Sequence, residues 1–142
     1  MTEIINNQRK LKLDWEIFKE FAETAVRRID EAENKSVTVA FVSDRRMRAL
    51  NKEFRAKDKT TDVLSFPFEA DEFDIERDFL GDIVISLEQA ARQTTENDLE
   101  LETEIKQLIL HGILHLCGYD HETDDGEMNR RELELRRALK IN

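Results

Sequence analysis

Three histidines within eleven residues constrain this 142-residue chain more than any other feature. The segment from His111 to His121 reads HGILHLCGYDH and contains every histidine of the sequence. His111 and His115 are four residues apart, so on a helix their side chains project from the same face. Gly118 is a suitable residue to end that helix, and His121 can then turn back toward the other two. We therefore expect a helix that ends near Gly118 and brings three imidazoles together.

Three convergent imidazoles predict a metal site. Two histidines at this spacing on a helix can bind one ion, and the full pattern H-x-x-x-H-x-x-G-x-x-H is that of the metzincin metalloproteases. The sequence offers no evident fourth ligand, and an open coordination position is typical of catalytic rather than structural zinc sites. Imidazoles suit zinc, nickel, cobalt and copper, so the spacing leaves the metal undetermined. Histidines without a metal and a purely structural metal site are the alternatives.

Residues next to the histidines narrow the chemistry. Metalloproteases have a glutamate after the first histidine as their general base, whereas this chain has Gly112, which cannot accept a proton. A peptidase is therefore only a minor alternative. Cys117 lies about 240° around the helix from His111, so we expect it in the core and not at the ion. Asp120 either orients a histidine or caps a turn, and the sequence favours neither.

The whole sequence, residues 1–142, predicts a single domain of interleaved strands and helices. It contains no internal repeat and no linker rich in proline, glycine or serine. The apolar patterns predict strands at 3–6, 36–42, 63–68 and 80–85, and helices at 14–31, 43–54, 86–94, 97–118 and 123–139. This order is not a strict alternation of strand and helix, which leaves α+β and mixed α/β as the two classes.

Individual residues should define the ends and faces of these elements. Four side chains can accept a hydrogen bond from a first-turn amide and so begin helices: Asp14, Ser43, Ser86 and Asn97. Met47, Leu50 and Phe54 have helical spacing and should face inward. Pro67 has no amide donor, so its strand should lie at the edge of a sheet or end there. Trp15 belongs to the apolar stripe of the first helix and should pack in the core.

The charges of the chain are segregated. The net charge of −10 argues against broad binding of nucleic acid, because phosphate binding is electrostatic. Residues 45–59, however, carry seven basic side chains and two acidic ones. One hypothesis is that several of these guide a strand along a basic groove: Arg45, Arg46, Arg48, Lys57 and Lys59. For each one singly, a solvated helix face is the simpler interpretation. We expect the acidic segment 69–78 to be an exposed loop.

Three absences in the sequence predict a cytoplasmic protein. The single cysteine permits no internal disulfide, which agrees with a reducing compartment. No signal peptide is visible, and no apolar run approaches the roughly 20 residues that span a bilayer.

Three further blocks accompany the histidine segment: LNKEFRAKD at 50–58, TDVLSFPF at 61–68 and LGDIVI at 80–85. Together, in this order, the four blocks resemble the YbeY-type endoribonucleases, which act in the maturation of ribosomal RNA. The histidine block is highly specific, and the resemblance covers most of the chain after the first helix. Thr60 is a mild departure, since many relatives have proline there.

This resemblance implies a fold, an activity and a set of residues. The fold would be α+β, with a small mixed sheet of about four strands packed against about five helices and a zincin-like metal helix. A zinc ion would be held by His111, His115 and His121, and Arg55 would be the functionally required arginine; Arg55 and His111 are the expected catalytic residues. The activity would be metal-dependent cleavage of single-stranded RNA, in 3′-end maturation of 16S ribosomal RNA and in ribosome quality control. The partners would be ribosomal RNA, a small-subunit ribosomal protein and a ribosome-assembly GTPase, with no membrane.

Several alternatives stay open. The chain could instead be a ribosome-assembly factor that binds RNA and has a mainly structural metal site. The general base could be water activated by the ion, Asp120, Glu122 or the 2′-hydroxyl of the RNA. Asp82 could approach the site or equally make a turn hydrogen bond at the end of its strand.

Overall fold

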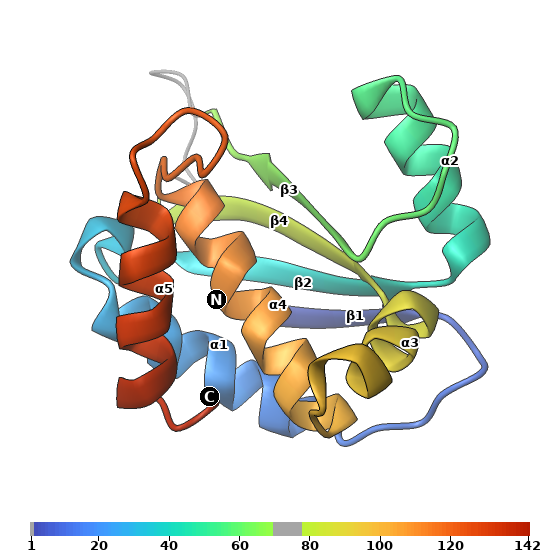
Figure 1. The fold of residues 1–142 in the computed structure, drawn as a ribbon, viewed down its shortest axis with the longest axis horizontal. Helices are drawn as coiled ribbons and strands as arrows, with labels where there is room; N and C mark the ends of the chain where they lie inside the picture. The colour runs from blue at the N-terminus through green and yellow to red at the C-terminus, as the bar shows by residue number, and fades with distance from the viewer. Residues whose placement is uncertain (1, 70–77) are drawn as a thin grey trace.

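The computed structural model describes residues 2–69 and 78–142, so most of the acidic segment 69–78 lies outside the described residues. Within these ranges the chain forms four strands and five α-helices (Figure 1). The strands are β1 (Glu3–Asn7), β2 (Ser36–Val42), β3 (Val63–Pro67) and β4 (Phe79–Ser86). The helices are α1 (Trp15–Arg28), α2 (Asp44–Arg55), α3 (Leu87–Asn97), α4 (Leu101–Leu116) and α5 (Glu127–Ala138), with a 3-10 turn η1 (Asp30–Ala32) after α1.

The four strands form one mixed sheet in the order β1-β2-β4-β3. β1, β2 and β4 are parallel, whereas β3 runs antiparallel to β4. Pro67 ends β3 at the edge of the sheet, where its missing amide costs no ladder hydrogen bond, as the sequence predicted. The predicted α+β class with a four-stranded mixed sheet and five helices is therefore confirmed for the described residues.

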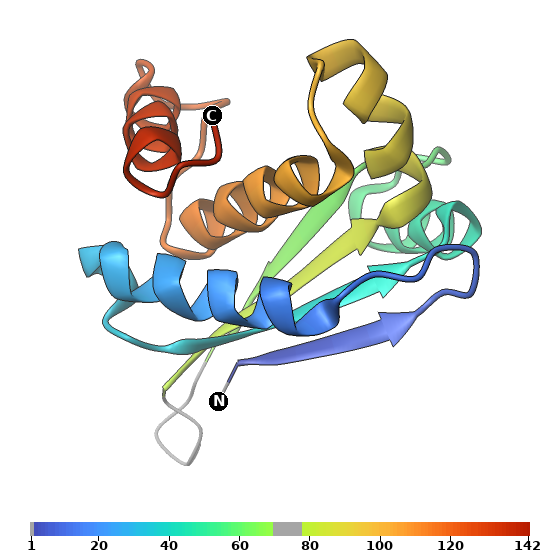
Figure 2. The same cartoon turned by 90° about the horizontal axis from the view of Figure 1, so that it is seen from below.

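Helices cover the two faces of the sheet unequally. Figure 2 shows α1 and α4 against one face, with α5 outside α4, while α2 lies on the opposite side of the sheet. The main core lies under α1 and α4 and includes Phe41, Ile83 and Ile109, all with no exposed area. A second, small cluster under α2 consists of Val42, Met47, Leu64 and Val84. Trp15 packs against the main core with its ring on Phe41, as predicted.

Glycine at position 112 allows α4 to lie close to the sheet. A Cβ atom added at Gly112 would come within 2.8 Å of Ile83 Cγ2 on β4, which is closer than real Cβ atoms approach. Position 112, at which a metalloprotease has its catalytic glutamate, is thus where α4 packs against β4 in this chain. Close contact here fixes the height of the following turn, which carries His115, above β3 and β4.

Some local predictions were wrong. Phe54, expected to face inward, is 57% exposed, because it lies on the last turn of α2, where its ring packs on Phe66 of the edge strand. Asn97, expected to begin α4, instead ends α3, and its amide donates to the Glu104 carboxylate at 3.0 Å. α5 begins at Glu127 and not near 123, because the Asp124 carboxylate accepts the amides of Gly126 and Met128.

The remaining caps agree with the sequence. The side chains of Asp14, Ser43 and Ser86 each accept a hydrogen bond from an amide in the first turn of α1, α2 and α3. Among the described helices, none has both the length and the apolar character that crossing a membrane requires.

Candidate metal centre and its cleft

The structure brings the three histidines together at the end of α4. His111 and His115 occupy successive turns of that helix, and His121 lies in the connection to α5. One side-chain nitrogen of each residue lies within 4.8 Å of the others, and the Nε2 atoms of His111 and His115 are 3.1 Å apart. Within residues 2–69 and 78–142, no further histidine, cysteine or carboxylate joins this group. These residues could therefore hold one metal ion and leave part of its coordination sphere open.

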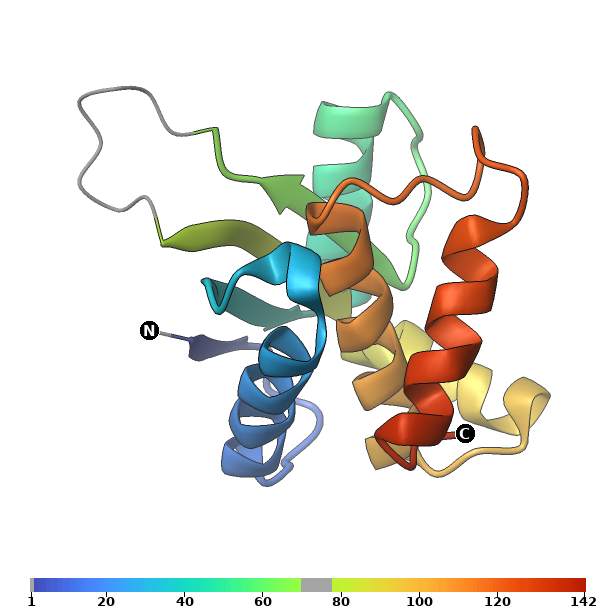
Figure 3. The same cartoon turned by 90° about the vertical axis from the view of Figure 1, so that its left-hand side faces the viewer.

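The chain turns back toward α4 through a short hydrogen-bonded connection. After α4 ends at Leu116, Gly118 has φ +98°, a backbone conformation that residues other than glycine rarely adopt. The Asp120 carboxylate then accepts the backbone N–H of Glu122 at 3.0 Å and closes a turn around His121. Asp120 could have oriented a histidine or capped a turn, and the structure shows it capping the turn. Figure 3 shows this connection running past the end of α4 before α5 begins.

Hydrogen bonds orient two of the three imidazoles. His115 Nδ1 lies 3.0 Å from the carbonyl oxygen of Tyr119, which can only accept, so Nδ1 carries the proton. His111 Nδ1 lies 2.6 Å from Glu132 Oε1, and a carboxylate likewise requires a proton on the ring nitrogen. Both rings are then left with an unprotonated Nε2 that faces the shared point. A lone pair at that position is what a metal ligand needs.

The electrostatic surroundings favour the neutral form of His115. Burial lowers the pKa of this imidazole, and the nearby rings of His111 and His121 lower it further, since neighbouring positive charges repel. For Glu132, burial alone would raise the pKa, but the contacts with His111 and Arg136 outweigh it and the pKa is lowered. The group that faces His111 is therefore an ionised carboxylate. These shifts suit a cluster of neutral ligands supported by one negative charge.

Sequence reasoning missed Glu132, although a signal for it was present. On α5 the buried residues are Met128, Glu132 and Leu135, so a carboxylate occupies an inward position of an otherwise apolar stripe. Such a charge requires a partner, which only the fold reveals 21 residues upstream in the sequence. Cys117, by contrast, behaves as expected: it packs against the core, and burial raises the pKa of its thiol to about 11.

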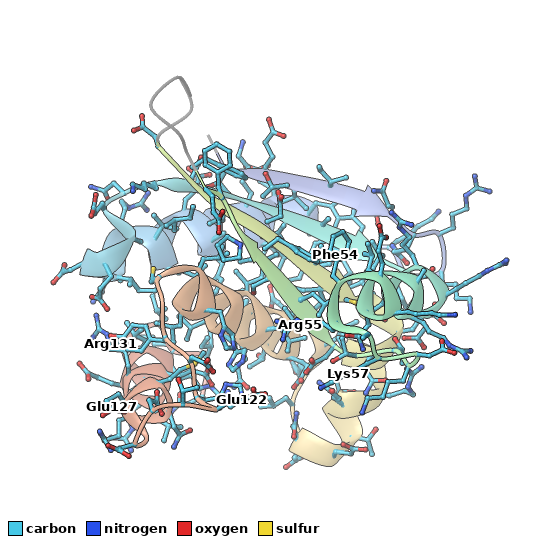
Figure 4. The ribbon with its side chains drawn as sticks, turned by 90° about the horizontal axis from the view of Figure 1, so that it is seen from above. Phe54, Arg55, Lys57, Glu122, Glu127 and Arg131 are labelled. Atoms are coloured by element: carbon cyan, nitrogen blue, oxygen red, sulfur yellow. The ribbon has the colours of Figure 1, made fainter. Side chains whose placement is uncertain are left out.

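A cleft of about 620 Å³ connects the histidines with the basic segment. One wall holds His111, His115 and His121 with the turn at 118–122, and the other holds Arg55, Lys57 and Lys59; β3 forms the floor between them. Figure 4 shows Arg55 and Lys57 near the end of α2 and Glu122 across from them on the connection after α4. Asn51 holds the basic wall together, since its buried amide donates to the carbonyl of Lys59 at 2.9 Å.

Other candidate residues lie elsewhere. Arg45 and Arg48 line a separate hollow, where Arg48 Nε pairs with Asp58 Oδ1 at 2.8 Å, and Arg46 does not line the cleft. The basic groove hypothesis therefore applies to Lys57 and Lys59 but not to these arginines. Asp82 is next to Ile83 on β4, and because Ile83 faces Gly112 of α4, Asp82 points to the opposite face of the sheet. It does not approach the histidines.

An α+β fold in which three histidines that could hold a metal ion line one cleft with an arginine and two lysines is an arrangement that an enzyme acting on an anionic substrate would have. Comparison with known proteins makes this specific. The family model described as Endoribonuclease YbeY matches residues 3–140. Endoribonuclease YbeY of Clostridioides difficile is 37% identical over 143 residues, covering 96% of this chain and 94% of the relative. That of Aquifex aeolicus is 44% identical over 127 residues, covering 89% and 83%.

A solved structure agrees. The solution structure of TM1509 from Thermotoga maritima matches with a TM-score of 0.65 and 32% sequence identity, over 98% of this chain and 89% of that one. This chain belongs to the YbeY family of endoribonucleases, enzymes that hydrolyse RNA.

Proposed function

We propose that this chain, as one catalytic domain over residues 1–142, is a zinc-dependent endoribonuclease that cuts single-stranded RNA in the cleft between α2 and the histidine cluster. One observation carries the proposal: Arg55 and all three histidines line the same cleft. A phosphodiester held there meets a potential metal ligand set on one side and a guanidinium on the other. The cleft of about 620 Å³ lies within the size range of ligand sites, which suits a short stretch of one strand.

The donor set fits a zinc ion. Three imidazoles at the observed separations, with Nδ1 of His111 and His115 held by acceptors, match catalytic sites of three histidines with an open position. A bound zinc ion supplies a Lewis acid that can polarise a phosphate oxygen and lower the pKa of water to about 7. In this proposal His111, His115 and His121 bind the ion and keep it at the cleft surface. Asp120 and Glu122, next to His121 in the cleft, are carboxylates that can accept a proton.

Arg55 has the properties of a phosphate clamp. Its guanidinium offers two parallel donors to a phosphate, an arrangement that a lysine does not provide. Within the described residues no carboxylate pairs with Arg55, whereas Arg48 on the same helix pairs with Asp58. Lys57 and Lys59 add positive charge to the same wall and attract the backbone on either side of the cleft phosphate.

The biological setting forms the second part of the proposal. The chain would act in the cytoplasm on the 3′ end of 16S ribosomal RNA and in ribosome quality control, with a small-subunit ribosomal protein and a ribosome-assembly GTPase as partners. Family membership supports the RNA substrate. The charge distribution supports a basic protein partner, because outside residues 45–59 the chain is strongly acidic and attracts positive surfaces.

A separate observation argues against each of the two alternatives. A structural metal site is closed by a fourth protein ligand, and none joins this group in the described residues. A peptidase needs a base after the first histidine, and Gly112 instead packs against Ile83.

A cleavage assay on single-stranded RNA, combined with zinc analysis, tests the proposal. The parent protein should contain one zinc ion and cut the RNA. His111→Ala should lose both zinc and cleavage. Arg55→Ala should keep its zinc and lose about 10²- to 10³-fold in rate, as when an electrostatic donor to the transition state is removed. Arg46→Ala is the matched control on α2 and should resemble the parent. Cleavage by His111→Ala at the parental rate would contradict the proposal.

A further inference from the structure

We propose that Glu132 is a positioning residue of the metal centre, which fixes His111 in the orientation and tautomer that bind the ion. The inference rests on the proposed metal site and adds α5 to it. Glu132 does not line the histidine cleft and does not reach the shared point of the three imidazoles. It acts through the far nitrogen of a ligand.

Distances and burial carry this inference. Glu132 Oε1 accepts the Nδ1–H of His111 at 2.6 Å, and Glu132 Oε2 accepts from Arg136 at 2.6 Å. The residue is 7% exposed, between Met128 and Leu135, which are 1% and 3% exposed on the same face of α5. Both oxygens of the carboxylate thus have a charged or polar partner, one on its own helix and one on α4.

Burying the Glu132 carboxylate costs free energy of hydration, which the hydrogen bond with His111 gives a reason for. A buried charge loses its hydration, and an ion pair with Arg136 at i+4 would form equally well on the exposed face of α5. Glu134 shows that alternative, since it pairs with Arg131 and its side chain is 72% exposed. The inward position of Glu132 adds one contact that an exposed position would lack, the hydrogen bond with His111. The inward position therefore points to the imidazole and not to the ion pair.

The expected effect on the metal follows from the hydrogen bond. A carboxylate that accepts from Nδ1 holds the proton there, keeps Nε2 free to bind and makes it more basic. Removing such a partner typically weakens metal affinity by about 10- to 100-fold. In Glu132→Gln the neighbouring Arg136 guanidinium, which only donates, favours the amide oxygen on its own side. The amide NH₂ then faces His111 Nδ1–H, so two donors oppose each other.

Zinc affinity, measured by competition with a chromophoric chelator at one fixed pH, tests the inference directly. Glu132→Gln should bind zinc at least about 10-fold more weakly than the parent, whereas the control Glu134→Gln on the same helix should stay within about twofold. Replacing Arg136 as well, in Glu132→Gln/Arg136→Met, frees the amide to turn its oxygen to His111 and should recover part of the loss. Circular dichroism of the zinc-free proteins should show equal helix content.

Nuclear magnetic resonance of the zinc-loaded parent provides a second readout. The His111 Nδ1–H proton should give a slowly exchanging signal that Glu132→Gln loses and Glu134→Gln keeps. If the parent binds zinc tightly and Glu132→Gln binds it equally well, Glu132 does not position the ligand. If the parent itself binds no zinc, the proposed metal site fails, and this inference fails with it.

Discussion

The two walls of the cleft differ in how firmly they are held. The histidine wall stands on α4, whose inward residues are buried in the main core, and two of its rings are tied by hydrogen bonds at Nδ1. The basic wall stands on α2, which has only Met47 and Asn51 buried and covers a cluster of four residues. A metal site needs fixed geometry, whereas a flexible chain of phosphates can be followed by mobile side chains. The difference teaches that the candidate metal ligands are held by more buried contacts than the cationic side chains are.

Removing one ligand should break the histidine wall as a site without unfolding it. In His115→Ala the ion loses one of three protein ligands, so we expect zinc content to fall to background and the RNA cleavage rate to drop by at least about 10³-fold. The helix should persist, because the imidazole is half-buried at its last turn and alanine favours helix. Zinc analysis, cleavage rate and circular dichroism check this. A folded His115→Ala that keeps stoichiometric zinc would contradict it.

Exchanging the cationic group should sharpen the role of the basic wall. Arg55→Lys keeps the charge but loses the two parallel donors, so its cleavage rate should fall by about 10-fold or more while RNA binding weakens little. Lys57→Ala should show the reverse, with weaker binding and a shallower dependence on salt, by about 0.7 in the log–log slope for one phosphate. Single-turnover cleavage and salt titration of binding separate the two. Equal behaviour of both variants would show that Arg55 acts only as a charge.

A methyl group at position 112 should disturb the packing of α4, which carries the histidine wall, against β4. The added Cβ of Gly112→Ala would lie 2.8 Å from Ile83 Cγ2, and the Ile83 side chain is fully buried. Overpacking of this kind costs about 1–3 kcal/mol in the free energy of unfolding. Urea unfolding measures the loss, and Ala22→Gly on α1 reports what an unrelated buried helix position costs. Alanine favours helix over glycine by up to about 1 kcal/mol, so a Gly112→Ala variant more stable than the parent by that amount would mean that the added methyl costs nothing and that α4 can move away from β4.

The support of the basic wall should weaken in acid. Asp44, in the first turn of α2, accepts hydrogen bonds from Ser86 at 2.7 Å and Thr60 at 3.1 Å and pairs with Arg92 at 2.6 Å. Burial alone would raise the pKa of this carboxyl, but these partners outweigh it and the pKa is lowered. A lowered pKa stabilises the fold above the unfolded value near 3.9, and this contribution is lost as the pH falls below it.

Comparison with Asp44→Asn measures that contribution. At pH 7 the variant should unfold about 1–2 kcal/mol more easily than the parent, since it loses the charge in its hydrogen bonds. Near pH 3 the difference should shrink, because the carboxyl of the unfolded chain is then largely protonated and its ionisation favours the folded state less. Urea unfolding at both pH values is the test. An unchanged difference between parent and variant would assign the effect to shape and not to charge.

The sequence predicted the histidine wall better than the basic wall, for a physical reason. Helical periodicity places His111 and His115 on one face whatever the rest of the chain does. Gly118 predicts the turn that brings His121 back toward them. The division of the basic segment could not be predicted, because Arg48 and Arg55 differ only in which neighbour the fold brings near them. The same holds for Phe54, whose exposure depends on where the sheet ends.

Long-range pairs marked the limit of prediction. The contact between Glu132 and His111 joins two helices across an irregular connection, and no spacing rule relates them. Asn97 had the local pattern of a helix start, yet α3 continued through it and its amide binds Glu104 instead. Local signals therefore predicted the elements and the ligand spacing, while tertiary partners decided how those signals were used.

X-ray absorption spectroscopy at the zinc edge of the purified protein tests the central claim most directly. Three imidazoles in an open cleft predict three nitrogen ligands from histidine at about 2.0–2.1 Å and one oxygen ligand from solvent. A sulfur ligand near about 2.3 Å, or a fourth side chain that completes the coordination sphere, would contradict an exposed catalytic ion beside Arg55.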